Sequence, residues 1–262
     1  MKHVSLGWCL VLGVLAAAAA APTAGAAEVR VMISGGLSAA YKELVPQYEQ
    51  MTGNTVITSY GPSMGTTANA IPVRLARGEA ADVLIMVGDA LGVMISAGYA
   101  LADTRVDLVR SPIGIAVRAG TPKPDISTPA ALKETLLKAK SVAYSDSASG
   151  VYVGNELFKR LGISAEMEGK AKMIPAEPVA AVVARGDAEL GFQQISELLP
   201  IPGAELVGPL PAELQKITIF SAALTKDGQQ RSQGKSLIDF LSSPAAGAAL
   251  LKSGLEPIAA AR

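Results

Sequence analysis

Small hydroxyl residues and glycines gather in loops that the pattern places between a strand and a helix. The first such loop is Ser34-Gly35-Gly36, and the second runs from Gly61 to Thr67. Glycine lets the backbone approach a ligand closely, and the N–H groups at the start of a helix attract an anion. These loops therefore predict two anion-binding positions on one face of the molecule. In the second loop, the expected ligand contacts are Ser63, Met64, Gly65 and Thr66.

Two further loops carry hydroxyl and amide side chains. Residues 145–152 follow a predicted strand and precede a helix, and Gln193-Gln194 ends another strand. Asp146 or Ser147 is also typical of a helix cap. The glutamines would supply hydrogen-bond donors and acceptors, and at least one of them is expected to point away from the cleft. From these loops we expect ligand contacts by Ser147, Ser149, Gly150, Val151, Gln193 and Gln194.

Three arginines are candidate partners for a carboxylate, because the planar guanidinium can bind it through two hydrogen bonds. Arg74 lies eight residues after Thr66, which is about two turns along the predicted helix, so it reaches the ligand or faces solvent. Arg110 and Arg118 flank the strand that enters the second half of the chain. Either could bind the ligand or be a surface or hinge charge.

The rarest residue types exclude several mechanisms. The only His, Cys and Trp of the chain are His3, Cys9 and Trp8, which all lie in the first nine residues. If that segment is removed, Ser-His-Asp hydrolysis, thiol nucleophiles and Cys/His zinc sites are excluded. A proton carrier would then be Asp, Glu, Lys, Tyr or a bound water. The candidates by position are Tyr60, Tyr144, Tyr152 and Asp89, and the sequence does not choose among them.

Residues 1–27 are typical of an export signal. Lys2 and His3 precede an apolar run over residues 4–21, and the small residues at 24–26 form a cleavage pattern. We therefore expect a periplasmic protein with no membrane anchor after cleavage. The chain has 23 basic and 23 acidic residues, so it has no basic excess to bind nucleic acid.

Strands and helices alternate along the chain and must position these loops. Residues 29–33, 54–60 and 82–87 are predicted strands, and residues 37–50 and 66–77 are predicted helices, the second kinked at Pro72. The same order restarts after Arg110. It predicts an α/β fold of two lobes, each a mostly parallel sheet flanked by helices, with the ligand cleft between them.

The second half of the chain completes this prediction. The expected strands are 113–117, 141–144, 172–174, 189–193 and 217–223, and the expected helices include 150–161, 178–184, 228–241 and 244–251. Residues 199–211 are expected to be a proline-rich passage. The chain crosses between the lobes near residues 108–112 and 216–224. The predicted division is a signal peptide at 1–27, lobe 1 at 28–110 with 222–262, and lobe 2 at 111–221.

The whole mature chain resembles the type II periplasmic solute-binding fold, and within it the molybdate-binding group. The resemblance rests on residues 29–37, 61–85, 145–162 and 184–192. Ser34 and Ser63 match the two serines of that group, but Gln193-Gln194 stands where the group has a tyrosine. The loop at 61–66 and the segment 69–74 also depart from the group. The resemblance implies the fold, whereas a cleft with added arginine and glutamine side chains is better suited to a carboxylate than to a compact oxyanion.

These departures resemble a subgroup of exported aconitate isomerases on the same scaffold. That resemblance implies interconversion of trans-aconitate and cis-aconitate by a 1,3-proton shift, with a tricarboxylate in the cleft and neither a cofactor nor a metal. The alternative is a periplasmic receptor that closes on a small carboxylate or a molybdate-like oxyanion and delivers it to an ABC permease. The receptor would need the same cleft but no proton carrier.

Overall fold

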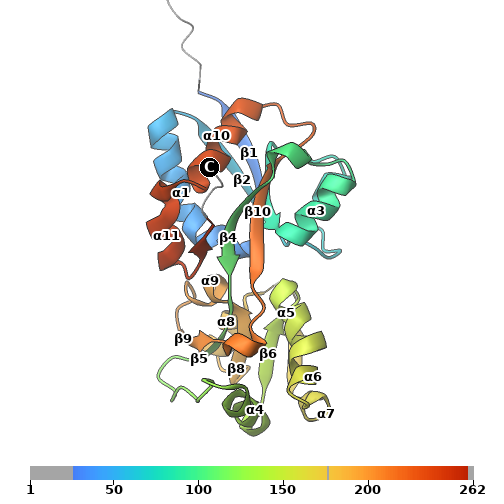
Figure 1. Cartoon of the computed structure of the whole chain (residues 1–262), viewed down its shortest axis with the longest axis vertical. Helices are drawn as coiled ribbons and strands as arrows, with labels where there is room; N and C mark the ends of the chain where they lie inside the picture. The colour runs from blue at the N-terminus through green and yellow to red at the C-terminus, as the bar shows by residue number, and fades with distance from the viewer. Residues whose placement is uncertain (1–25, 176, 259–262) are drawn as a thin grey trace, which may run out of the picture.

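The computed structural model describes residues 26–175 and 177–258. Figure 1 shows two halves stacked along the long axis of the molecule, each built around its own β-sheet. The two-lobe α/β architecture expected from the sequence is thus confirmed. The predicted signal peptide lies almost wholly outside the described residues, and the exact lobe boundaries remain a prediction.

The first lobe is built on a sheet with six strands in its described part, in the order β11-β4-β10-β3-β1-β2. β1 pairs in parallel with β2 and β3, whereas β10 pairs antiparallel with β3 and β4. The strands are β1 (Glu28–Ile33), β2 (Thr55–Tyr60), β3 (Val83–Val87), β4 (Val106–Ser111), β10 (Thr218–Leu224) and β11 (Glu256–Pro257). The helical segments are η1 (Gly35–Leu37), α1 (Ser38–Thr52), α2 (Ile71–Ala76), α3 (Gly88–Ser96), η2 (Ala102–Thr104), α10 (Arg231–Leu241), η5 (Pro244–Ala246) and α11 (Gly247–Lys252).

The described second lobe contains a five-stranded sheet in the order β7-β6-β8-β5-β9. β6 pairs in parallel with β7 and β8, and β5 pairs antiparallel with β8 and β9. The strands are β5 (Ile113–Arg118), β6 (Val142–Ser145), β7 (Ala171–Ile174), β8 (Leu190–Gln194) and β9 (Ala204–Pro209). The helical segments are α4 (Pro129–Lys138), α5 (Ala148–Tyr152), η3 (Val153–Leu157, a π-helical turn), α6 (Phe158–Arg160), α7 (Ser164–Met167), α8 (Val179–Ala184), α9 (Ile195–Leu198) and η4 (Ala212–Leu214).

The strands that connect the lobes explain why each sheet is mixed rather than parallel throughout. β4 ends at Ser111 in the first sheet, and β5 begins at Ile113 in the second. β10 returns the chain to the first sheet. These crossing strands run against their neighbours, whereas the strands joined by helical crossovers remain parallel.

Apolar helix faces cover both sides of each sheet. In the first lobe, Tyr41, Leu237 and Leu250 pack with one face, while Ile71 and Leu91 pack with the other. In the second lobe, one core contains residues of α4 to α7 and the other face is covered by α8 and α9. This two-sided packing buries the strands and leaves the loops at their ends to form the site.

Two predicted elements differ from the structure. The helix expected at 66–77 extends only over α2, and Pro72 lies in its first turn instead of kinking it, because proline suits a helix start. The passage at 199–211 contains the strand β9, which lies at the edge of its sheet and ends at Pro209, where a proline is tolerated. Among the described residues, no helix is long and apolar enough to span a membrane.

Candidate functional site

A cavity of about 360 Å³ lies between the two lobes. Loops at the ends of parallel strands form it, as expected for an open α/β sheet. The first lobe contributes Ser34, Gly35, Gly36, Tyr60, Ser63 and Met64. The second lobe contributes Asp146, Ser147, Glu177, Gln193, Gln194 and Glu197. The structure thus brings together nine of the predicted site residues, Tyr60 among them, and adds three carboxyl side chains that were not assigned to the site.

Ser34 follows β1 directly, and its backbone N–H donates to the carbonyl of Ile85 at 3.0 Å. The side chain is 3% exposed, and within the described structure its Oγ has no hydrogen-bond partner. A buried hydroxyl without a partner costs about 1–3 kcal/mol. Because Ser34 lines the cavity, a ligand acceptor placed there would remove that cost. This is the clearest sign of a polar ligand in the structure.

Ser63 lies in the loop after β2 and is equally buried. Its Oγ accepts a hydrogen bond from the N–H of Val87 at 2.9 Å, so its hydroxyl hydrogen can still donate into the cavity. Gly61 makes this loop possible, because a Cβ there would collide with the carbonyl of Asn69. The predicted contacts Gly65 and Thr66 lie further along the same loop, where they are exposed and outside the cavity lining.

A cluster of serine hydroxyls follows β6 in the second lobe. Ser145 Oγ lies 2.8 Å from Ser147 Oγ and 3.1 Å from Ser149 Oγ. Ser147 lines the cavity, whereas Ser149 is buried behind it. Gly150 packs against the carbonyl of Ser145, where no Cβ would fit, and Val151 is exposed on α5. Ser147 is therefore the residue of this loop best placed to contact a ligand.

Gln193 and Gln194 have different surroundings. The amide of Gln194 lies 2.9 Å from Ser111 Oγ and 2.8 Å from Thr218 Oγ1, so it joins the two strands that cross between the lobes. Gln193 Oε1 accepts from the N–H of Val179 at 3.0 Å, and this bond turns the amide N–H₂ towards Glu197. Both glutamines line the cavity, but Gln194 links the two crossing strands, whereas Gln193 links Val179 to Glu197.

Glu197 is one of the cavity-lining carboxyl groups that the sequence reasoning missed. It lies in α9, three residues after the end of β8, and is largely buried while lining the cavity. Burial raises the pKa of Glu197 to about 7, the hydrogen bond from Gln193 opposes this rise, and the charge of Asp146 adds to it. An acidic residue placed so soon after a strand end was the available signal. The four-residue helix is too short to show a periodic pattern.

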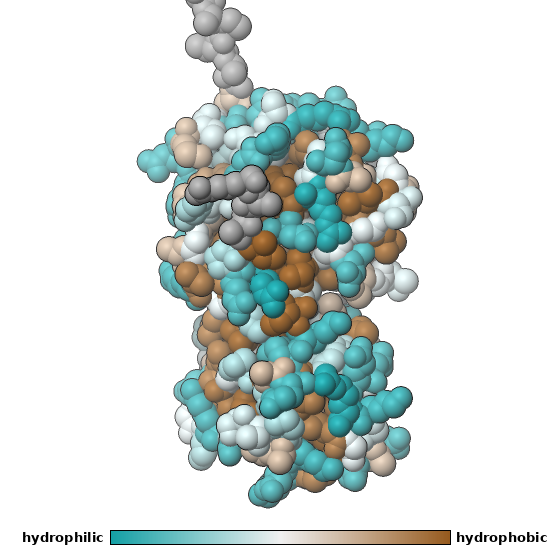
Figure 2. All heavy atoms as spheres, viewed as in Figure 1, coloured by the Kyte–Doolittle hydropathy of each residue, from teal (hydrophilic) through white to brown (hydrophobic). Residues whose placement is uncertain are grey.

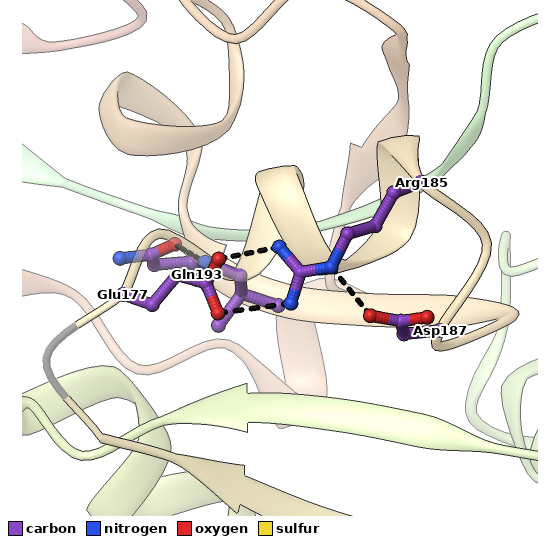
Figure 3. A network of polar contacts seen from close by, with 5 residues as sticks. Glu177, Arg185, Asp187 and Gln193 are labelled. Atoms are coloured by element: carbon purple, nitrogen blue, oxygen red, sulfur yellow. Dashed lines mark hydrogen bonds and ion pairs between the residues drawn. The ribbon is translucent and has the colours of Figure 1, made fainter.

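Glu177 also lines the cavity but has a different environment. Figure 3 shows the Arg185 guanidinium between the carboxylates of Glu177 and Asp187. Arg185 binds Glu177 through two nitrogens, and this contact lowers the pKa of Glu177. Arg185 therefore compensates the negative charge of Glu177, and the lowered pKa makes Glu177 a weaker base than Glu197.

The three predicted arginines lie outside the cavity lining. Arg74 Nε donates to Glu79 at 2.6 Å within its own lobe. Arg110 pairs with Glu256 at 3.4 Å, and Arg118 is exposed beside a second cavity at the other end of the second lobe. The described residues that line the site cavity include no Lys or Arg. Neutral hydroxyl and N–H donors are thus the groups available to an anion there.

The four predicted proton carriers also occupy different places. Tyr60 lines the cavity, but desolvation raises its pKa, and Lys42 Nζ lies 5.2 Å above its ring. Tyr152 is buried and donates to the carbonyl of Leu214. Tyr144 packs edge-on against Phe158, and Asp89 is exposed on α3. Among the described residues, no group of three or more acidic, His or Cys side chains is arranged to hold a metal ion.

Comparison with known proteins defines the class of this protein. Residues 29–256 match the family model of the bacterial extracellular solute-binding proteins, and the chain belongs to this family. It is 50% identical over 230 residues to an aconitate isomerase of a Pseudomonas species, covering 88% of each chain. It is 25% identical to a molybdate-binding protein of Azotobacter vinelandii, covering 88% of this chain and 91% of that one.

Solved structures agree with this fold. The sulfate-binding protein SubI of Mycobacterium tuberculosis superposes with a TM-score of 0.70 at 16% identity, covering 88% of this chain and 87% of that one. A periplasmic molybdate-binding protein of Azotobacter vinelandii superposes with a TM-score of 0.68 at 18% identity, covering 87% and 98%. At these identities the likeness establishes the architecture alone.

Proposed function

We propose that this protein is a cofactor-independent isomerase that interconverts trans-aconitate and cis-aconitate in the cavity between its lobes. The observation that carries the proposal is the placement of three carboxyl side chains, beside Ser147, on the second-lobe wall of the cavity, whereas the described first-lobe wall contributes hydroxyl donors and no charged side chain. The 50% identity to an aconitate isomerase over 88% of both chains supports the same substrate. The described cavity volume of about 360 Å³ suits a small organic acid.

A passive receptor for an anion would gain nothing from carboxyl groups in its binding cavity. An ionised carboxylate repels a bound anion, and the repulsion strengthens as water is excluded. A proton-transfer enzyme, in contrast, needs such a group beside its substrate. The carboxyl side chains of the second lobe therefore favour the isomerase over the receptor.

The donors of the first lobe would bind the substrate carboxylates. Ser34 has a hydroxyl without a partner, and Ser63 retains a hydrogen to donate. Removal of a proton beside a carboxylate spreads negative charge into that carboxylate. Fixed donors stabilise this developing charge without having to reorganise. The same wall would therefore contribute to binding and to the rate.

We place the protein in the periplasm after removal of residues 1–27, with a tricarboxylate as its small anionic ligand and no membrane anchor. A permease partner belongs only to the receptor alternative.

The test is direct. Purified mature protein is mixed with trans-aconitate, and cis-aconitate is followed by chromatography or proton NMR until the ratio is constant. We expect the same final ratio when the reaction starts from either isomer. Tight binding without turnover would instead establish a passive receptor, and preferential binding of molybdate or tungstate would overturn the carboxylate assignment.

A further inference from the structure

Three features of the structure converge on the carboxyl group of Glu197. It lines the cavity from the second lobe, opposite the donors of the first. It lies against Gly35, since a Cβ built at Gly35 would collide with its Oε1. Gln193 donates a hydrogen bond to it, and the backbone N–H of Val179 fixes the orientation of that glutamine. The carboxyl group is thus positioned between the anion-binding loop and a fixed donor.

We propose that Glu197 is the catalytic residue that removes the substrate proton and returns it. This inference rests on the proposed isomerase function and assigns its proton carrier. Tyr144, Tyr152 and Asp89 lie outside the cavity lining. Tyr60 lines the cavity, but desolvation raises its pKa above an already high value, and Glu177 is compensated by Arg185. A single carboxyl group can serve both steps, because the two reacting carbons belong to one three-carbon unit.

The proposed step is balanced without any co-reactant. A carboxylate oxygen of Glu197 forms an O–H bond as a C–H bond of the substrate methylene carbon breaks. The electron pair of that bond spreads over the three-carbon unit and into a neighbouring carboxylate. Glu197 then gives a proton to the carbon at the far end, its O–H bond breaks, and the double bond has moved. The carboxylate is restored for the next turnover.

The acidity of the group agrees with this role. Burial raises the pKa of Glu197 to about 7, and a carrier with a pKa near the working pH is both sufficiently basic and sufficiently often ionised. Other charges at the cavity are Asp146, which raises this pKa, and Glu177, which is paired with Arg185. Gly35 and Gln193, the neighbours on the packed elements, do not titrate.

Glu197→Gln is the decisive variant, with Glu166→Gln as its matched control. Glu166 also lies in the first turn of a four-residue helix of the second lobe, but outside the cavity lining. We expect Glu197→Gln to lower kcat by about 10²- to 10⁴-fold. The Kd for trans-aconitate, measured by calorimetry, should stay the same or fall, because glutamine removes a charge that repels the ligand, and Glu166→Gln should keep the wild-type kcat. Because glutamine resembles the protonated acid in shape, the fold should be retained, and a melting curve checks this.

Isotope exchange separates proton transfer from substrate binding. In D₂O at saturating substrate, the carboxyl proton of Glu197 exchanges with solvent before some of the returns to carbon. The wild type should therefore place deuterium in both substrate and product, and Glu197→Gln should lose this exchange in proportion to kcat. Glu197→Asp, which retains a carboxyl group, should recover part of it. If Glu197→Gln turns over at the wild-type rate, or if only Asp146→Asn loses exchange, the assignment of Glu197 is overturned and the isomerase function stands. If the wild type binds aconitate without any turnover, the proposed function itself fails, and this inference with it.

Discussion

The two walls of the cavity are built from different chemistry, although both consist of loops that follow parallel strands. The first lobe presents Ser34 and Ser63 on tight glycine-containing loops, with no charged side chain among the described lining residues that it contributes. The second lobe presents Asp146, Glu177 and Glu197. One wall can hold an anion, and the other would repel it unless a carboxyl group carries or exchanges a proton.

The difference shows how one fold supports both binding and catalysis. In the first lobe, a buried hydroxyl remains without a partner until a ligand arrives, so its cost is recovered on binding. In the second lobe, a buried carboxyl group is disfavoured as a charge in the folded protein, and the same feature makes it a better base. Both walls give up some stability of the folded state at the site. Figure 2 shows that the molecule narrows between the lobes, where this site lies.

The largest expected effect concerns the stability cost of Glu197. The pKa of Glu197 is raised from 4.5 to about 7 on folding, so the folded state holds this proton more tightly than the unfolded state. The stability that this group contributes is full below pH 4.5 and is lost as the pH rises through about 7. Glu197→Gln should therefore gain stability relative to the wild type over this range, by about 3 kcal/mol above pH 8. Urea unfolding at several pH values measures the difference in unfolding free energy between the variant and the wild type. A difference that does not change with pH would show that folding does not raise the pKa of Glu197.

The next effect tests the contact between the two walls. Gly35→Ala places a methyl group where Glu197 Oε1 lies, and the carboxyl group must move aside. We expect kcat to fall by about 100-fold, because a displacement of about 1 Å is enough for such a loss. The fold should be retained, since the displaced atom is the end of a flexible side chain. Steady-state kinetics at saturating substrate measures kcat. A normal kcat would show that turnover does not depend on the position of the Glu197 carboxyl group beside Gly35.

Substitutions of Ser34 and Ser63 test the first-lobe wall of the cavity, here called the binding wall, without changing the second lobe. Ser34→Ala and Ser63→Ala each remove a hydrogen bond to a charged ligand, so affinity should fall by about ten- to a hundred-fold, or about 1.5–3 kcal/mol. Their stabilities should differ. Ser63→Ala leaves the Val87 N–H without its acceptor and should destabilise the fold by about 1–3 kcal/mol, whereas Ser34→Ala removes a hydroxyl that has no partner and should not. Calorimetry and thermal melting together distinguish these outcomes.

The smallest effect is expected for Arg74→Lys. Arg74 is paired with Glu79 on the surface of its own lobe and lies outside the cavity lining, so kcat and KM should both stay within about twofold of wild type. A marked loss of kcat would mean that the lobes close far enough to bring this arginine to the substrate. In that case the Arg74 guanidinium would belong to the first-lobe wall, although it lies outside the cavity lining in this structure.

Much of the binding wall was predictable from local sequence. A strand followed by Ser-Gly-Gly or by a Gly-Pro-Ser loop indicates close backbone approach and hydroxyl donors, and Ser34, Gly35 and Ser63 do line the cavity. The strand β1 and the helix α1 also follow from short-range patterns. Such features depend on a few neighbouring residues, so one sequence is enough to indicate them.

The second-lobe wall, with Asp146, Glu177 and Glu197, was not predictable in the same way. Glu197 lies in a four-residue helix and takes its character from Gly35 and Gln193, of which the first is far away in the sequence. Likewise, Arg74 and Arg110 were plausible ligand contacts until their partners Glu79 and Glu256 were known. Burial and ion pairing are set by residues distant in the chain, so the residue type alone does not reveal them.

The sequence by itself determined the alternation of strands and helices, the glycine and serine loops at the strand ends, and the exclusion of imidazole and thiol chemistry once residues 1–27 are removed. These follow from composition and from periodicities of two and 3.6 residues. Only the tertiary structure decided which loops meet, which charges are compensated and which carboxyl group is desolvated. The reason is physical: a pKa depends on the surroundings of a group in three dimensions, and those surroundings arise only when the two lobes are brought together.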